Sequence, residues 1–340
     1  MRVGYQYHET PSQTSDETAL GIRLHAQKKF GNYFDTGVTL CGVTGNGKTG
    51  FEGIPFFDEE NRDYAVLAEG WIGAGWQDTR LRLGRQQIDT PFADSDDIGM
   101  VPNTFDALWM QSKIAEDTLL SLGWLYRWGG VDAPTQRHYS KLSDNKGVAV
   151  AGINYEGIEH MSLSAWVYHA LGLVTASYLE AGWQNKHKAG QYGFDMQSIY
   201  QHNVHREDSR AIGMRSYYGH DVSGVTASLS FNKTFGAPAD NLWGGGPFFT
   251  NVEHNTLTQA GPDGSVLVFS LDWDVTAAGI DGLQLGASID HHLHKGGRNA
   301  EFDLRANYGW SEKSELSVVY SDVKTPERFK NLRIFYNYTF

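Results

Sequence analysis

Short runs of strictly alternating apolar and polar residues recur along the chain, and they limit its fold more than any other feature. Between residues 118 and 128, Leu120, Leu122 and Trp124 share one face of an extended chain, with Ser121 on the opposite face. Alternation with a period of two residues over such lengths indicates strands and not helices. We therefore expect an all-β protein with no helix longer than a turn or two.

The alternating segments number about eighteen over 340 residues, or about 19 residues for each strand with its connection. A membrane-spanning strand of roughly 9–11 residues followed by a loop needs this length. Long connections (45–62, 89–104, 129–146 and 234–264) alternate with short ones, as in an up-and-down barrel. The pattern predicts a closed antiparallel transmembrane β-barrel of about 18 strands, formed by residues 1–340 as a single domain, with both termini at the short-turn rim. The expected strands are 1–8, 17–29, 33–44, 63–76, 79–88, 105–114, 118–128, 147–155, 160–169, 174–185, 188–202, 209–219, 223–233, 265–275, 282–292, 299–309, 313–323 and 329–340.

The two faces of the strands indicate which side of the barrel meets lipid. Polar faces carry many Gly, Ser, Gln and Arg residues, which would line water well but would pack poorly in a core. Apolar faces often end in aromatic residues, as an interfacial girdle requires, at Trp76, Trp128, Tyr218, Trp273 and Trp310. We expect the following residues to face lipid: Leu20, Ile22, Leu24, Leu120, Leu122, Trp124, Leu332, Ile334 and Tyr336.

Composition excludes several other classes of protein. The net charge is −12 and no run is rich in Lys or Arg, which excludes a nucleic-acid-binding surface. No stretch approaches the roughly 20 apolar residues of a spanning helix. The single cysteine, Cys41, excludes a disulfide framework and a multi-cysteine metal site. Alternation begins directly after Met1 without an apolar export signal, so we expect a mature chain with an added start.

Several segments resemble a known family. Residues 84–106, GRQQIDTPFADSDDIGMVPNTFD, resemble the segment that enters the third extracellular loop of the OprD family of outer-membrane porins. Residues 244–250, GGGPFFT, resemble the inward-folded seventh loop of relatives from the Campylobacterota, and Phe340 resembles the C-terminal signature of barrel assembly. The resemblance implies a porin with inward-folded loops in the bacterial outer membrane, surrounded by lipid and lipopolysaccharide, as a monomer or a homotrimer.

The resemblance also implies an eyelet, in which basic residues on the barrel wall face acidic residues of an inward loop. The alternation alone places eight arginines on polar strand faces, where they are candidates for the pore lining. Guanidinium groups in a narrow lumen would attract anions and pass them on stepwise. The alternative is that individual arginines pair with inward carboxylates and only hold the shape of the barrel. The candidates are Arg2, Arg23, Arg80, Arg82, Arg127, Arg215, Arg305 and Arg333.

The acidic side of this eyelet is predicted in the loop at 89–104. Asp89, Asp94, Asp96 and Asp97 lie there, and opposite the arginines they would create a transverse electric field. A calcium site and a solvated acidic loop are the alternatives, although the spacing matches no complete EF-hand loop. Asp94, Asp96 and Asp97 are expected to face Arg82, Arg305 and Arg333 across the gap.

A second inward loop is predicted within residues 236–256. Its aromatic residues would need burial, which is unusual for an exposed loop, and its three glycines permit a tight path against the wall. Folded into the lumen beside residues 89–104, this loop would narrow the channel. The segment consists of Trp243, Gly244, Gly245, Gly246, Pro247 and Phe248.

Two further motifs point to other chemistry. Residues 42–49, GVTGNGKT, match the phosphate-loop pattern, but Gly and Pro in the following residues exclude the helix that such a loop requires. We therefore reject nucleotide binding. His291, His292 and His294 could bind a metal ion, but adjacent strand residues point to opposite faces, so we expect a cluster at the rim instead.

The sequence favours a passive diffusion channel for small anionic or zwitterionic solutes, with no enzymatic activity and no cofactor. One alternative is an outer-membrane barrel enzyme of the lipase or protease type. It would need a nucleophile beside an oriented histidine, and no such motif stands out. The other alternative is a soluble carbohydrate-binding β protein with exposed aromatic residues. Such a protein would stay in solution without detergent.

Overall fold

The computed structural model describes residues 1–47, 53–144, 146–294, 297–325 and 328–340. Over these residues, nineteen strands form one sheet, and β8 (Ser140–Lys141) pairs only with the end of β7. The remaining strands form an antiparallel barrel wall in chain order, which confirms the predicted eighteen-stranded barrel. They are β1 (Arg2–Glu9), β2 (Thr14–Phe30), β3 (Phe34–Asn46), β4 (Tyr64–Trp76), β5 (Thr79–Gln86), β6 (Thr104–Ala115), β7 (Thr118–Gly129), β9 (Val148–Tyr155), β10 (Met161–Ala170), β11 (Val174–His187), β12 (Gly190–Asn203), β13 (Ser209–His220), β14 (Val225–Gly236), β15 (Ser265–Asp274), β16 (Leu283–His294), β17 (Gly297–Ser311), β18 (Ser314–Lys324) and β19 (Phe329–Tyr338).

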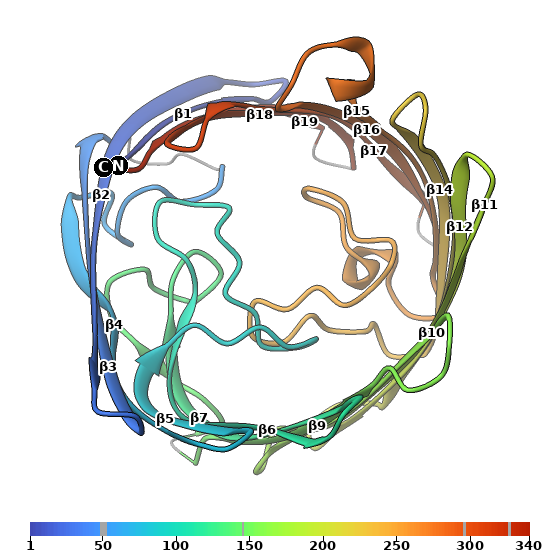
Figure 1. Cartoon of the computed structure of the whole chain (residues 1–340). Helices are drawn as coiled ribbons and strands as arrows, with labels where there is room; N and C mark the ends of the chain where they lie inside the picture. Colours follow the sequence, from blue (N-terminus) through green and yellow to red (C-terminus); the bar gives the residue numbers. More distant parts are fainter. Residues whose placement is uncertain (48–52, 145, 295–296, 326–327) are drawn as a thin grey trace.

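Strands β1 and β19 close the sheet into a cylinder. Their antiparallel pairing runs from Arg2 opposite Asn337 to Glu9 opposite Lys330. The amino group of Met1 donates a hydrogen bond of 2.8 Å to the carbonyl oxygen of Tyr338, and the two termini lie side by side (Figure 1). Both termini therefore lie at the rim of the short connections, as the alternating loop lengths predicted.

The alternation of side chains along β2 shows how sequence determines the two faces of the wall. Ile22 and Leu24 are 46% and 61% exposed, and they point away from the barrel. Arg23, between them, contacts Asp97 of a loop inside the barrel. The same alternation leaves large apolar side chains exposed around the outside of the wall, where lipid replaces water as the solvent.

One aromatic residue that we expected in the outer girdle lies elsewhere. Trp128 is only 7% exposed and stacks on Phe105, with ring centroids 6.1 Å apart. The register between β6 and β7 shifts at Asp106, and β8 pairs with the last residues of β7. Local period-two counting misses such a shift. The other four predicted girdle residues are exposed: Trp76, Tyr218, Trp273 and Trp310.

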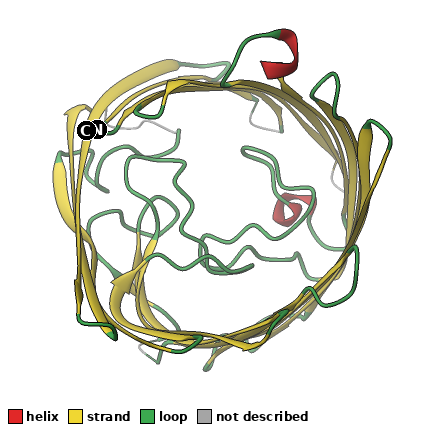
Figure 2. Ribbon diagram, in the orientation of Figure 1, coloured by secondary structure: helices red, strands yellow, loops and turns green. Residues whose placement is uncertain are grey.

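Long connections fold into the barrel and fill much of its interior (Figures 1 and 2). They include the β5–β6 loop (87–103), the β7–β9 loop (130–147) and the β14–β15 loop (237–264). The predicted inward loops are thereby confirmed. The helical turns in the described chain are the four-residue 3-10 helices η1 (Leu257–Ala260) and η2 (Val275–Ala278). None of the helices in the described ranges is long and apolar enough to span a membrane.

Candidate functional site

The β5–β6 and β14–β15 loops meet backbone to backbone inside the barrel. The Trp243 N–H donates to the carbonyl of Phe92 at 3.0 Å, and the Asp94 N–H donates to the carbonyl of Trp243 at 3.3 Å. A Cβ atom at Gly245 would collide with the backbone of Phe92, so this close approach requires glycine. The glycines were expected to allow a tight path against the wall, but at Gly245 the close neighbour is the other loop.

Aromatic rings hold this junction against the wall. Phe92 is fully buried, and its ring centroid lies 5.4 Å from Tyr168, 6.3 Å from Tyr178 and 6.5 Å from Phe248, each in an edge-on arrangement. Trp243 joins the same cluster at 6.4 Å from Tyr168. Edge-on aromatic pairs add to the apolar burial that stabilises the two loops inside the lumen.

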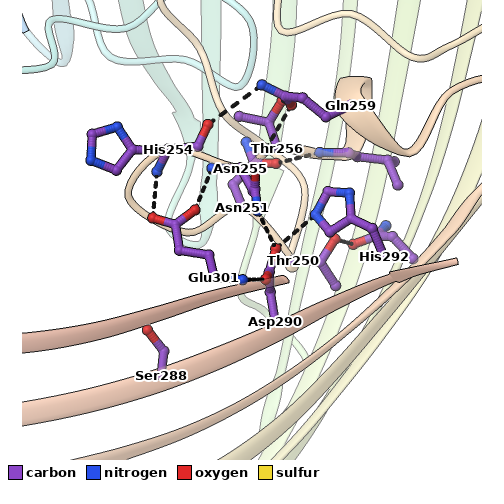
Figure 3. A network of polar contacts seen from close by, with 12 residues as sticks. Thr250, Asn251, His254, Asn255, Thr256, Gln259, Ser288, Asp290, His292 and Glu301 are labelled. Atoms are coloured by element: carbon purple, nitrogen blue, oxygen red, sulfur yellow. Dashed lines mark hydrogen bonds and ion pairs between the residues drawn. The ribbon is translucent and has the colours of Figure 1, made fainter. Parts of the chain in front are cut away.

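A network of polar contacts attaches the β14–β15 loop to strands β16 and β17 (Figure 3). The two carboxylate oxygens of Glu301 accept hydrogen bonds from the backbone N–H groups of His254 at 2.9 Å and Asn255 at 2.6 Å. The Asn255 side chain donates to Asp290 at 3.1 Å, and the imidazole of His292 lies 2.7 Å from the same carboxylate. These wall residues are almost fully buried beneath the loop, so they determine where the loop lies.

The sequence reasoning missed this anchor. Glu301 was not a candidate, and His292 was expected in a cluster at the rim. His292 does lie two residues from the long-loop end of β16, but it is fully buried beside Asp290, because both residues share the inward face of that strand. The side chain of His294 lies outside the described residues. The sequence signal that could have revealed these loop contacts is the presence of inward acidic residues on two adjacent strands, Asp290 on β16 and Glu301 on β17.

Arg215 and Arg305 line the lumen beneath the loops. The guanidinium of Arg215 pairs with Asp195 at 2.8 Å and lies over the ring of Phe249, 4.7 Å from its centroid. Arg305 donates to the Ser288 hydroxyl at 2.9 Å and to Asp272 at 3.2 Å. Both arginines are partly exposed, so their charges are accessible to a solute in the lumen.

Arg333 occupies a different environment from the one we expected. Its side chain is 6% exposed and lies 2.5 Å from Glu253 of the β14–β15 loop. Its direct ion-pair partner is therefore Glu253 of the other inward loop, although Asp96 of the acidic loop also lies close enough to interact with its charge. Arg333 therefore helps to fix the β14–β15 loop on the wall, because Glu253 directly precedes His254 and Asn255, whose backbone N–H groups donate to Glu301.

Asp97 also pairs with other arginines than the three we expected. Its carboxylate lies 2.9 Å from Arg2 and 3.2 Å from Arg23, on the first two strands of the wall. Arg82 packs instead on the ring of Trp71, with its guanidinium 4.0 Å from the ring centroid. The predicted match of Asp97 with Arg82, Arg305 and Arg333 is wrong, because loop placement depends on contacts that strand alternation does not encode.

The remaining candidate arginines pair with carboxylates of the wall. Arg80 forms an ion pair with Asp35. Arg127 lies 2.7 Å from Asp106, which also holds Arg85 at 2.8 Å near the long-loop ends of β5, β6 and β7. For these residues the observed contacts correspond to the shape-holding role that the sequence left as the alternative.

The acidic loop has two carboxyl groups that hold their protons unusually well. Burial and the neighbouring Asp89 raise the pKa of Asp94 to about 6. Burial, together with Asp132 and Glu253, raises the pKa of Asp96 to about 6, although Arg333 opposes this shift. These two groups therefore change charge near neutral pH, where an ordinary aspartate stays ionised.

Two cavities lie between the loops and the wall. One has a volume of about 410 Å³ and is lined by Asp96 and Glu253 from the loops and by Arg215 and Arg305 from the wall. The other has a volume of about 660 Å³ and carries carboxylates at Asp89, Glu156 and Glu180. The two cavities share the residues Arg215, Phe249 and Asn251.

Other predicted features have plain structural outcomes. Gly42 to Asn46 of the phosphate-loop pattern form the end of β3, whereas Lys48 and Thr49 lie outside the described residues. In the described part of the chain, no group of three or more His, Cys, Asp and Glu residues is arranged to hold a metal ion.

Solved structures with a similar fold include outer-membrane proteins of two bacterial species. OpdK of Pseudomonas aeruginosa, crystallised with vanillate, has a TM-score of 0.87 at 16% identity, with 99% of this chain and 96% of OpdK covered. OccK9 (OpdG) of the same species gives 0.86 at 17% identity and the same coverage. OccAB2 of Acinetobacter baumannii gives 0.86 at 16% identity, with 100% and 96% covered.

At these identities the solved structures establish the fold alone. No curated protein sequence matches the chain significantly. The family model described as "outer membrane porin, OprD family" matches residues 33–317, which is most of the chain. The chain therefore belongs to the OprD family of outer-membrane porins and forms a channel in the bacterial outer membrane.

Proposed function

We propose that this porin is a passive diffusion channel that favours small zwitterionic or carboxylate-bearing solutes. The observation that carries the proposal is the cavity of about 410 Å³, in which Arg215 and Arg305 face Asp96 and Glu253. Opposed charges across a narrow gap orient a dipolar solute as well as attract it. The family match favours a channel over the barrel enzyme and the soluble carbohydrate-binding protein.

The second cavity extends this charge pattern. Its carboxylates are Asp89, Glu156 and Glu180, and its arginine, Arg215, is already paired with Asp195. The surplus of negative charge suits the ammonium end of a zwitterion. A solute that spans the shared wall would place its ammonium group here and its carboxylate near Arg305 in the first cavity.

Transport also requires that each contact be weak enough to release the solute. Ser228, Ser230, Ser270 and Asn251 line the first cavity and offer neutral hydrogen bonds beside the charges. Arg305 shares its donors with Ser288 and Asp272, which moderates its attraction for a carboxylate. The crystal structure of the similar protein OpdK contains vanillate, a carboxylate, which agrees in chemistry with the proposed preference.

Reversal potentials in planar bilayers test this proposal. We expect Arg305→Gln to lower permeability for anions relative to cations, and Asp96→Asn at pH 8 to raise it. Arg210→Gln is the matched control, because Arg210 packs on Tyr200 on the outer face of the wall and its charge is remote from the lumen. Unchanged reversal potentials in both lumen variants would show that these residues do not control ion passage.

A further inference from the structure

The outer wall of the barrel has an apolar hollow that the channel does not use. Its volume is about 660 Å³, and it crosses five consecutive strands from β9 to β13. The outward side chains form two rows in register across these strands. One row is Tyr155, Leu163, Ala181, Met196 and Met214, and the other is Ile153, Ala165, Leu179, Ser198 and Ile212.

Small side chains create the hollow. Ala165 and Ala181 are diagonal neighbours on β10 and β11, and Ser198 continues the depression on β12. Larger side chains flank it, including Leu179 and Met196, which are 55% and 52% exposed. The hollow is continuous with the lipid-facing wall, so in the membrane it must be filled by something apolar.

Exposed aromatic side chains flank the hollow towards both rims, with Tyr200 on β12 towards the long loops. On β9 and β10, however, the hollow reaches the short-turn ends of the strands, at Tyr155 and Leu163, which indicates the leaflet that supplies the occupant. Trp183 and Phe194 lie two residues nearer the short-turn rim than Ala181 and Met196 on the same strands. Both rings are exposed, as in an interfacial girdle. In outer-membrane barrels the short turns face the periplasm. The hollow therefore lies on the membrane side of the periplasmic girdle.

Basic side chains lie on the periplasmic side of this girdle, where the same two strands meet. Lys186 is the last residue but one of β11 and lies 2.7 Å from Asp221, so it shares its charge with that carboxylate, and Lys188 lies in the turn into β12. Basic side chains at a membrane surface attract the phosphates of lipid headgroups, at about 1 kcal/mol for each residue. The apolar hollow, the aromatic girdle and the basic turn follow one another along the barrel axis.

We propose that this face binds one glycerophospholipid of the periplasmic leaflet, with an acyl chain in the hollow and the phosphate at the turn that bears Lys188. Lipopolysaccharide fits less well, because it occupies the leaflet at the opposite, long-loop rim. A second barrel also fits less well, because two convex barrel walls touch only along a narrow strip and would leave most of the hollow unfilled. The proposal is independent of the solute that the channel carries.

Native mass spectrometry of the intact porin, extracted in mild detergent, tests the proposal. We expect the wild type to retain one phospholipid for each barrel. Ala165→Leu with Ala181→Leu should fill the hollow and reduce retention by more than about tenfold, since each buried methylene contributes about 0.8 kcal/mol. Lys188→Gln should reduce it about fivefold. Ala65→Leu, at an outward position on β4, is the matched control and should retain lipid as the wild type does.

Several outcomes would overturn the proposal. These are an absence of retained phospholipid in the wild type, equal retention in all variants, or a bound mass that corresponds to lipopolysaccharide or to a second barrel. Single-channel conductance serves as the folding check, because variants of the outer wall should conduct as the wild type does. If the double variant fails to insert, Ala181→Leu alone provides the same comparison.

Discussion

Removal of the Glu301 carboxylate should release the β14–β15 loop from the barrel wall. Its two oxygens accept the backbone N–H groups of His254 and Asn255 at 2.9 and 2.6 Å, and Asn255 is 2% exposed. A buried donor without a partner costs about 1–3 kcal/mol. Glu301→Gln keeps one acceptor oxygen and should orphan one donor, whereas Glu301→Ala should orphan two.

The expected free-energy costs are therefore graded. The relevant equilibrium is between the loop bound to the wall (seated) and the loop released from it (unseated). Glu301→Gln should destabilise the seated state by about 1–3 kcal/mol, and Glu301→Ala by about 2–6 kcal/mol. Since 1.4 kcal/mol is a factor of ten in an equilibrium constant, the lower limits correspond to about fivefold and thirtyfold increases in the unseated fraction. Aromatic contacts of Trp243 and Phe248 still hold the other end of the loop, so we expect partial opening.

Single-channel recording measures this fraction as time spent in a state of higher conductance. The occupancy of that state should rise in the order wild type, Glu301→Gln, Glu301→Ala. Glu312→Gln makes the same chemical change at an exposed residue of the turn between β17 and β18 and should leave the recording unchanged. If Glu301→Ala inserts and conducts at the wild-type level without a new state, the anchor assigned to Glu301 is wrong.

The junction of the loops, the acidic loop and the sidedness of the wall give three further predictions. Gly245→Val should separate the inward loops and raise conductance, and a conductance equal to that of the wild type would contradict the close approach. Because the pKa values of Asp94 and Asp96 are about 6, lowering the pH from 7 to 5 should protonate both and raise anion over cation permeability. The double variant with asparagine at both positions should lose most of this shift, although histidines that gain a proton act in the same direction. A cysteine at position 23 should react with a membrane-impermeant reagent and one at position 22 should not, and the reverse result would invert the faces of β2.

Much of the fold could be predicted because strand alternation is a local property of the sequence. Ile22 and Arg23 fall on opposite faces wherever β2 lies, so the lipid side and the lumen side follow from adjacent letters. The prediction failed at Trp128, where a register shift and the pairing of β8 intervene. Both causes involve residues outside the strand itself.

The candidate site could be predicted only in part, because its contacts join distant segments. The sequence indicated that Trp243 needs burial, but its backbone partner Phe92 lies about 150 residues earlier. Similarly, the pairing of Arg333 with Glu253 depends on how the β14–β15 loop lies on the wall. Strand alternation assigns each arginine to the inward face. It does not identify which of the many inward acidic residues is the ion-pair partner of that arginine.

The closure of the barrel by β1 and β19 has a consequence for the order of folding. The paired residues Arg2 and Asn337 are separated by nearly the whole chain, whereas every other wall pairing joins neighbours in sequence. Closing a flexible loop of that length costs on the order of 5 kcal/mol of chain entropy. Assembly of the intervening strands removes this cost, because a curved sheet brings its own edges together. The seam should therefore form last, as the step that makes an open, edge-bearing sheet into a sealed wall.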